Sequence, residues 1–185
     1  MTLQILLGST RPGRNGESVA KWVADIAVMK DGVDVELVDI AKFNLPILDE
    51  PYPPAMGQPY TKEHTKIWSE KINEADAYIF VTPEYNHAVP GNFKNAIDYL
   101  SKEWANKVVG FVGYGALGAV RAIENWRVIA SELQMADVKT EVLLTLSNDF
   151  ENYSVFKPQP QQEQSLNLLL DQVILWSKGM KSIRN

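Results

Sequence analysis

Two arginines and a group of small residues follow the first apolar run of the chain, in the stretch GSTRPGRNGES (residues 8–18). The stretch stands between an expected strand and an expected helix, where unpaired N–H groups and the helix dipole favour an anion. Arg11 and Arg14 add guanidinium groups suited to phosphate oxygens. Ser9, Thr10 and Ser18 offer hydroxyl groups, and Gly13 and Gly16 permit a tight backbone turn. The pattern predicts a phosphate-binding loop, and a charged surface turn is the alternative.

The spacing of this stretch argues against nucleotide hydrolysis. Gly8 and Gly13 have the separation of a Walker A loop, but Arg14 and Asn15 stand where that motif requires Lys followed by Ser or Thr. The predicted anion is therefore held without the lysine on which phosphoryl-transfer loops depend.

A second loop, TPEYNHAVPGN (residues 82–92), is long for a connection between a strand and a helix. Its two prolines restrict the backbone, Tyr85 offers a stacking face, and Asn86 offers hydrogen bonds to a polar ring edge. These groups suit a planar heteroaromatic ligand, although a purely structural loop remains open.

A third loop, GYGALG (residues 113–118), matches GxGxxG. The dinucleotide fingerprint normally follows the first strand and is completed by an acidic residue at the end of the next one, and neither condition is met. We interpret the glycines as allowing close backbone approach to a ligand held by the other loops. A dinucleotide-phosphate site and a simple tight turn are the alternatives.

Several classes of function are disfavoured by composition. The 185 residues include no Cys and only 2 His, and no GxSxG or Ser–His–Asp set occurs, so we expect no catalytic side chain and no metal site. The net charge of −5 argues against nucleic acid, and no apolar run has the roughly 18 residues needed for membrane insertion. The N-terminus lacks signal-peptide features. We expect a cytoplasmic protein with a single domain over residues 1–185.

The elements that must position these loops follow from periodicity. Short apolar runs alternate with segments of helical period, which predicts a parallel sheet covered by helices on both faces. The expected strands are 3–7, 33–38, 77–82, 108–112 and 138–144. The expected helices cover about 18–29, 61–72, 93–100, 119–134 and 162–180. Ligands of such sheets lie outside the carboxyl ends of the strands, where the three loops are expected.

Three segments together resemble a known family. GSTRPGRNGESVAKWV, PEYNHAVPGNFKNAIDYL and GYGALGAVRA are similar to the NAD(P)H-dependent FMN reductases, which include quinone, azo-dye and chromate reductases. The resemblance runs from the first strand to about Arg121 and covers the last third only by architecture. It implies an α/β, flavodoxin-like three-layer sandwich with a five-stranded parallel sheet of order 2-1-3-4-5.

The resemblance also implies a set of FMN-binding residues. Those expected at the phosphate are Ser9, Arg11, Arg14, Asn15, Gly16 and Ser18; those along the isoalloxazine are Pro83, Glu84, Tyr85 and Asn86; those in a third wall are Gly113, Tyr114 and Gly115. Family members carry paired glycines where this chain has Gly118 and Ala119. This difference affects the expected shape of the third wall.

The function that the resemblance implies is two-electron transfer through bound FMN. NADPH or NADH would give a hydride, and a quinone, free flavin or similar small acceptor would then replace the donor in a ping-pong cycle. The alternative is a flavodoxin-like electron carrier or partner-binding module without its own nicotinamide reaction. The resemblance further implies a homodimer or homotetramer, formed partly through the helix after PEYN with Phe93, Asp98, Tyr99 and Trp104.

Overall fold

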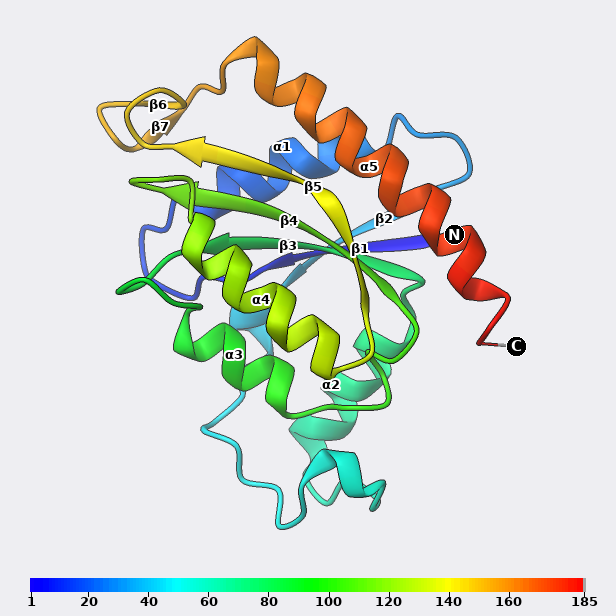
Figure 1. Cartoon of the computed structure of the whole chain (residues 1–185). Helices are drawn as coiled ribbons and strands as arrows, with labels where there is room; N and C mark the ends of the chain where they lie inside the picture. Colours follow the sequence, from blue (N-terminus) through cyan, green and yellow to red (C-terminus); the bar gives the residue numbers. More distant parts are fainter. Residues whose placement is uncertain (185) are drawn as a thin grey trace.

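A five-stranded parallel sheet forms the centre of the molecule. The computed structural model describes residues 1–184. The strands are β1 (Thr2–Leu7), β2 (Asp34–Asp39), β3 (Ala77–Pro83), β4 (Val108–Gly115) and β5 (Ala136–Thr145). Their order is β2-β1-β3-β4-β5, as predicted, so β1 and β3 are interior neighbours and β2 is an edge (Figure 1).

Helices cover both faces of the sheet (Figure 1). One face carries α1 (Gly16–Ala27) and α5 (Pro160–Lys181), and the other carries α2 (Glu63–Asn73), α3 (Gly91–Asp98) and α4 (Val120–Glu132). Two short 3₁₀ helices, η1 (Ile40–Phe43) and η2 (Pro54–Met56), interrupt the excursion after β2. A small antiparallel hairpin, β6 (Phe150–Glu151) and β7 (Val155–Phe156), follows β5 and was not expected from the sequence.

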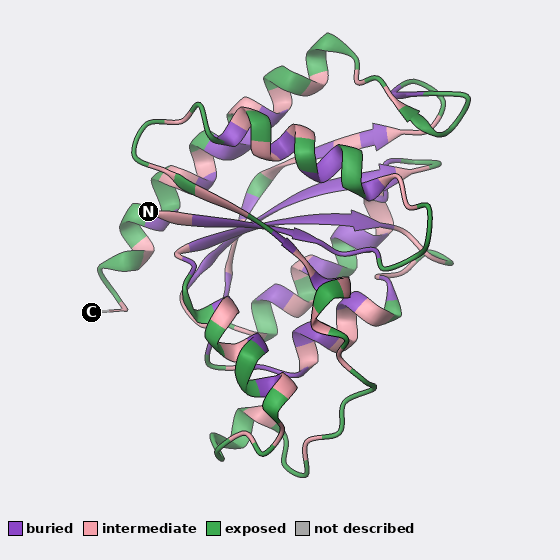
Figure 2. Ribbon diagram, turned by 180° about the vertical axis from the view of Figure 1, so that it is seen from behind, coloured by how far each residue is buried: buried purple, intermediate pink, exposed green. Residues whose placement is uncertain are grey.

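Strand alternation divides the core into two layers. Leu3, Ile5 and Leu7 of β1 point into an aliphatic layer under α1 and α5, whereas Leu6 points into the other layer. That second layer is rich in aromatic rings. Because both faces are covered, all seven residues of β3 are buried, and Figure 2 shows the central strands as buried nearly throughout.

The aromatic layer corrects one expectation about self-association. Phe93, Tyr99 and Trp104 are fully buried within the chain, and Trp104 lies beyond the end of α3. Their rings pack inside the second layer, where Phe80 contacts Trp104 at a centroid separation of 6.3 Å. These side chains cannot also supply a surface between subunits. Their apolar periodicity reflects the chain's own core.

Residues 1–184 contain neither a membrane-spanning helix nor a cluster of metal ligands. None of the helices combines the length and the hydrophobicity that crossing a membrane requires. Within the same range, no group of three or more His, Asp or Glu side chains is arranged to hold a metal ion.

Candidate functional site

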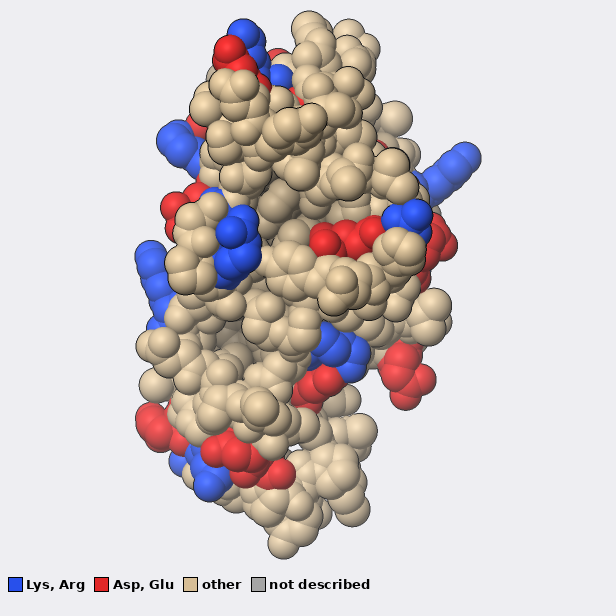
Figure 3. Space-filling view, turned by 90° about the vertical axis from the view of Figure 1, so that its left-hand side faces the viewer, with Lys and Arg blue, Asp and Glu red and all other residues tan. Residues whose placement is uncertain are grey.

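The loops after β1, β3 and β4 meet at the carboxyl ends of the strands and enclose a cavity of about 200 Å³. Its lining residues are Ser9, Arg11, Asn15, Pro83, Glu84, Tyr85, Tyr114, Gly115, Ala116 and Leu146. The first eight belong to the set expected from the sequence. Figure 3 faces this edge of the molecule and shows mostly uncharged atoms at its centre, with separate basic and acidic groups around them.

The first loop presents one free guanidinium beside an uncapped helix. Arg11 is exposed, and its Nη1 makes only a long contact, 3.5 Å, to the neighbouring Pro12 carbonyl. Helix α1 begins at Gly16, and the side chain of its N-cap, Asn15, makes no capping hydrogen bond. The N–H groups of the first turn therefore remain available to an anion near Arg11.

Arg14 has a different environment from Arg11. Its Nη2 lies 2.7 Å from a carboxylate oxygen of Asp39, its Nε donates to Glu17 at 3.0 Å, and its Nη1 donates to the Ser9 carbonyl. Burial lowers the pKa of Arg14, but the hydrogen bonds and charges of Asp39 and Glu17 outweigh burial and raise it. Arg14 thus fastens the loop to the end of β2 and does not line the cavity.

Two tyrosines bring the second and third loops against the first. The hydroxyls of Tyr85 and Ser9 share a hydrogen bond of 3.0 Å. Tyr114 packs against the start of α1, where a Cβ at Gly16 would lie 2.5 Å from the tyrosine oxygen. Residue 16 is therefore restricted to glycine by this contact. Burial raises the pKa of Tyr114, so its hydroxyl stays protonated.

Glu84 ties the second loop to the helix that follows the third. Its carboxylate accepts hydrogen bonds from the backbone N–H of Arg121 at 3.0 Å and of Ala122 at 3.3 Å, and from the Arg121 guanidinium at 3.0 Å. Burial raises the pKa of Glu84, but the bonds from Arg121 and Ala122 outweigh it and lower the pKa. The carboxylate is an ionised cap for α4 supplied by another loop.

The remaining expected residues lie near the cavity without lining it. Asn86, with His87, forms the exposed turn of a tight hairpin in which Tyr85 and Ala88 exchange two 3.1 Å backbone bonds. Ser18 is exposed and donates to the Asn15 carbonyl. Gly113 permits the close approach of Gly118, whose carbonyl would lie 2.2 Å from a Cβ at position 113.

A fourth segment, after β5, was missed from the sequence. Leu146 lines the cavity, and its N–H donates to the Gly115 carbonyl at 3.0 Å. Further along, the Asn15 amide donates to the Tyr153 carbonyl at 2.9 Å, so the β6–β7 hairpin touches the first loop. The parallel topology offered a signal, because the end of β5 lies at the same edge as the other three.

The sheet order and the helices on both faces define a flavodoxin-like fold, with a tyrosine-lined cavity beside the loop after β1. A model of the family described as NADPH-dependent FMN reductase matches residues 1–149. The chain belongs to this family; it is an enzyme, and FMN is its cofactor.

Curated relatives agree with this family, and a solved structure shares the fold. The chain is 45% identical over 125 residues to NAD(P)H-dependent FMN reductase ntnL of Nectria sp. That alignment covers 65% of this chain and 62% of the relative. It is 38% identical over 146 residues to NAD(P)H-dependent FMN reductase C4B3.06c of Schizosaccharomyces pombe, covering 78% and 73%. It is 41% identical over 97 residues to quinone reductase of Escherichia coli K12, covering 52% and 48%. The structure of FerB, a flavoenzyme NAD(P)H:(acceptor) oxidoreductase from Paracoccus denitrificans, superposes with a TM-score of 0.73 at 21% identity, covering 97% of this chain and 98% of that one.

The residues present fit FMN. A free guanidinium and an uncapped helix start suit its phosphate, and the glycine at position 16 keeps Tyr114 close to that helix start. Tyr85 and Tyr114 supply aromatic surface beside the same cavity, and Gly115 of the third loop lines it without a side chain.

Proposed function

We propose that this enzyme oxidises NADPH or NADH and passes two electrons to a quinone, free flavin or a similar small acceptor. The observation that carries the proposal is the cavity itself, which joins a cation and a helix start to two aromatic rings. No Cys, His or Lys side chain lines that cavity within residues 1–184. When bound, FMN supplies the hydride chemistry that such a site needs.

The protein's part is to hold and orient reactants. Arg11 and the first turn of α1 would hold the phosphate, with Ser9 and Asn15 beside them. Tyr85, Pro83, Tyr114 and Gly115 would flank the ring system. Backbone N–H groups of these loops would stabilise negative charge on the ring edge, which is an electrostatic contribution of fixed dipoles. Glu84 would position the ring-flanking residues indirectly, because its carboxylate fixes the second loop to α4.

We further propose a ping-pong order, in which the oxidised nucleotide leaves before the acceptor binds. Both partners would have to reach the same ring system beside the same loops, which favours binding in turn. The initial velocities at several fixed acceptor concentrations should therefore give parallel lines in double-reciprocal plots. Intersecting lines would show that both partners bind at once.

The colour of the purified protein provides the main test. The protein should be yellow, and NADPH or NADH should bleach it under anaerobic conditions, with colour restored by a simple quinone. A colourless protein that does not bind added FMN would overturn the proposal. A yellow protein that neither nucleotide reduces would favour a flavodoxin-like electron carrier.

We also propose that the whole chain acts as one cytoplasmic reductase domain that assembles as a homodimer or homotetramer. Exposed apolar side chains on the excursion after β2 support self-association, because Ile47 is 88% and Met56 is 63% exposed. Light scattering over a range of protein concentrations tests the assembly, and a constant monomer mass would contradict it. Cell fractionation tests the location.

A further inference from the structure

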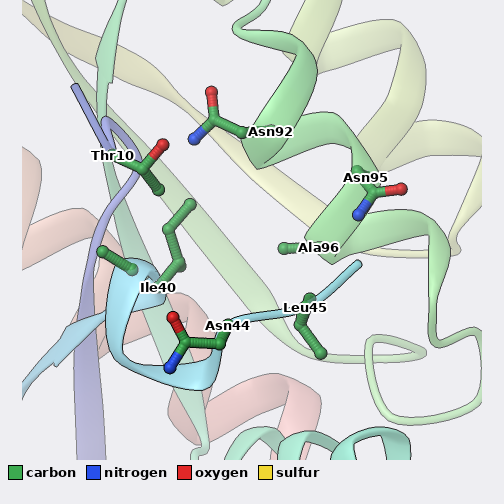
Figure 4. A pocket seen from close by; sticks show the side chains of 8 residues that line it. Thr10, Ile40, Asn44, Leu45, Asn92, Asn95 and Ala96 are labelled. Carbon is green, nitrogen blue, oxygen red and sulfur yellow. The ribbon is translucent and has the colours of Figure 1, made fainter. Parts of the chain in front are cut away.

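A second cavity, of about 400 Å³, lies between the loop after β1, η1 with the residues that follow it, and the first turns of α3 (Figure 4). Thr10 and Asn92 border it at one end, Asn44 at the other, and Ile40 points into it between them (Figure 4). We propose that this cavity binds the adenosine half of the nicotinamide dinucleotide donor. The proposal rests on the proposed function, which supplies the dinucleotide.

The two cavities are separated by one turn of chain. Thr10 borders the second cavity, while its neighbours Ser9 and Arg11 line the first. The Asn92 amide donates to the Gly8 carbonyl at 3.0 Å, so the first turn of α3 is fixed to the same loop. A ligand long enough to cross this loop can therefore reach both cavities at once.

The second cavity offers unused hydrogen-bonding groups beside apolar ones. Thr10 and Asn44 are exposed, and within residues 1–184 no protein group is hydrogen-bonded to the Thr10 hydroxyl or the Asn44 side chain, so a ligand would replace water at both. Ile40, Leu45 and Ala96 contribute apolar surface next to these groups. A purine ring with its ribose needs both kinds of contact, and the volume lies within the range of small-molecule sites.

The charge of the cavity restricts the occupant further. No charged side chain lines it, and the carboxylate of the adjacent Asp39 is already used by Arg14 at 2.7 Å and by the Ala41 N–H at 3.1 Å. A neutral group is therefore favoured over a phosphate. In NADH, adenosine is a neutral group at the end farthest from the reacting ring, so the cavity favours NADH over NADPH, whose adenosine carries a 2′-phosphate.

A small acceptor is a poorer candidate for the same place. A quinone held in the second cavity would have the loop after β1 between itself and the residues that line the first cavity. The cavity suits the remote end of a long reactant, and the dinucleotide is the long reactant of the proposed reaction.

Asn44 allows a test with little strain. Its φ of 46° lies in the left-handed region, which glycine and aspartate tolerate, so Asn44→Gly removes the amide and Asn44→Asp adds a charge. Asn106→Gly is the matched control, because Asn106 has a φ of 60° and precedes β4 at the opposite edge of the sheet. The FMN-loaded proteins are titrated calorimetrically with ADP-ribose and with its 2′-phosphate. ADP-ribose represents the adenosine half of NADH, and its 2′-phosphate represents that of NADPH.

We expect Asn44→Gly to weaken ADP-ribose binding about fivefold, as for a lost hydrogen bond, and Asn44→Asp to weaken binding of the 2′-phosphate about tenfold or more, because the carboxylate repels that phosphate. The KM for NADH or NADPH should rise by a similar factor. Reduced nicotinamide mononucleotide, which lacks adenosine, should keep its KM, and the Asn106 variant should match the wild type throughout.

Three results would overturn the assignment: absence of ADP-ribose binding to the wild type, equal binding in the wild type and both Asn44 variants, or an equal loss with the mononucleotide. A protein that neither dinucleotide reduces would instead contradict the proposed function. In that case the ADP-ribose titration still decides what the cavity binds.

Discussion

At the scale of single residues, two arginines three positions apart have different surroundings. Arg11 is exposed at the cavity, whereas the side chain of Arg14 is only 10% exposed and is paired with Asp39. The residue types predicted an anion site, but the sequence alone could not assign the pairing. Asp39 lies 25 positions from Arg14 and reaches it only because β2 pairs with β1 in the observed register.

Arg11→Ala should weaken FMN binding by about 1.5–3 kcal/mol, the usual contribution of a hydrogen bond to a charged group. The side chain makes no ion pair within residues 1–184, so its removal should leave the free energy of unfolding of the apoprotein nearly unchanged. Quenching of FMN fluorescence during titration measures the affinity. Arg11→Lys keeps the charge and should recover part of the loss. Unchanged affinity in Arg11→Ala would mean that the phosphate binds elsewhere.

Glu84→Gln tests the connection between the second loop and α4. The amide keeps the size of the carboxylate but loses the charge that faces the N–H groups of Arg121 and Ala122. We expect a loss of about 1 kcal/mol in the free energy of unfolding, typical of a helix cap. FMN should also bind more weakly, and its visible absorption bands should shift as the wall moves.

Arg121→Leu separates the two contributions to this connection. It removes the guanidinium, whose side chain is 40% exposed, and leaves both backbone bonds in place. It should therefore cost less stability than Glu84→Gln in urea denaturation. A larger loss in the Arg121 variant would show that the ion pair, and not the capped helix, holds the loops together.

At the scale of elements, the turn from β4 into α4 contains a strained residue. Ala119 has a φ of 62°, and it follows Gly118, whose φ is 68°. The left-handed conformation costs an L-residue roughly 1–2 kcal/mol, and this position is where relatives are expected to carry a second glycine.

Ala119→Gly should therefore stabilise the protein by about 1 kcal/mol, because relief of strain exceeds the added freedom of the unfolded chain. The matched control is Gly118→Ala, in which a Cβ would lie 2.6 Å from the Cβ of Leu143 and should destabilise strongly. Thermal unfolding followed by circular dichroism measures both. A lower Tm for Ala119→Gly would show that the methyl group contributes packing that outweighs the strain.

The large elements were predictable from sequence, and the small ones were not. Continuous apolar runs predicted β3 and β4, and a 3.6-residue period predicted α1 and α4, since these patterns follow directly from burial. The β6–β7 hairpin has two-residue strands and a turn through Asn152 and Tyr153, both with positive φ and neither a glycine. Phe150 packs on Phe156 across this hairpin, at 5.1 Å between ring centroids, and no short-range sequence pattern predicts that contact.

At the scale of the whole molecule, the two ends of the parallel strands differ in what they carry. Both cavities lie at the carboxyl ends, and a buried lysine that lines neither cavity lies at the amino ends. Lys107 is 5% exposed, and its Nζ donates to the Ile72 and Asn73 carbonyls at 3.0 and 3.2 Å and to the Tyr78 hydroxyl at 3.0 Å. These bonds hold the last turn of α2 against the start of β4, at the end of the sheet opposite the FMN-binding loops.

This lysine should make the protein more stable as the pH rises from about 8. Burial, together with the charge of Arg184, lowers the pKa of Lys107 to about 8, against an ordinary value of 10.5. Between these two values the unfolded chain binds a proton that the folded chain does not, so the free energy of unfolding increases with pH, by at most about 1.4 kcal/mol per pH unit. Urea denaturation at pH 7.5 to 9.5 should show the increase in the wild type and in Lys102→Met, an exposed control, and lose it in Lys107→Met. The same rise in Lys107→Met would mean that another group titrates in this window and that Lys107 stays charged in its buried place.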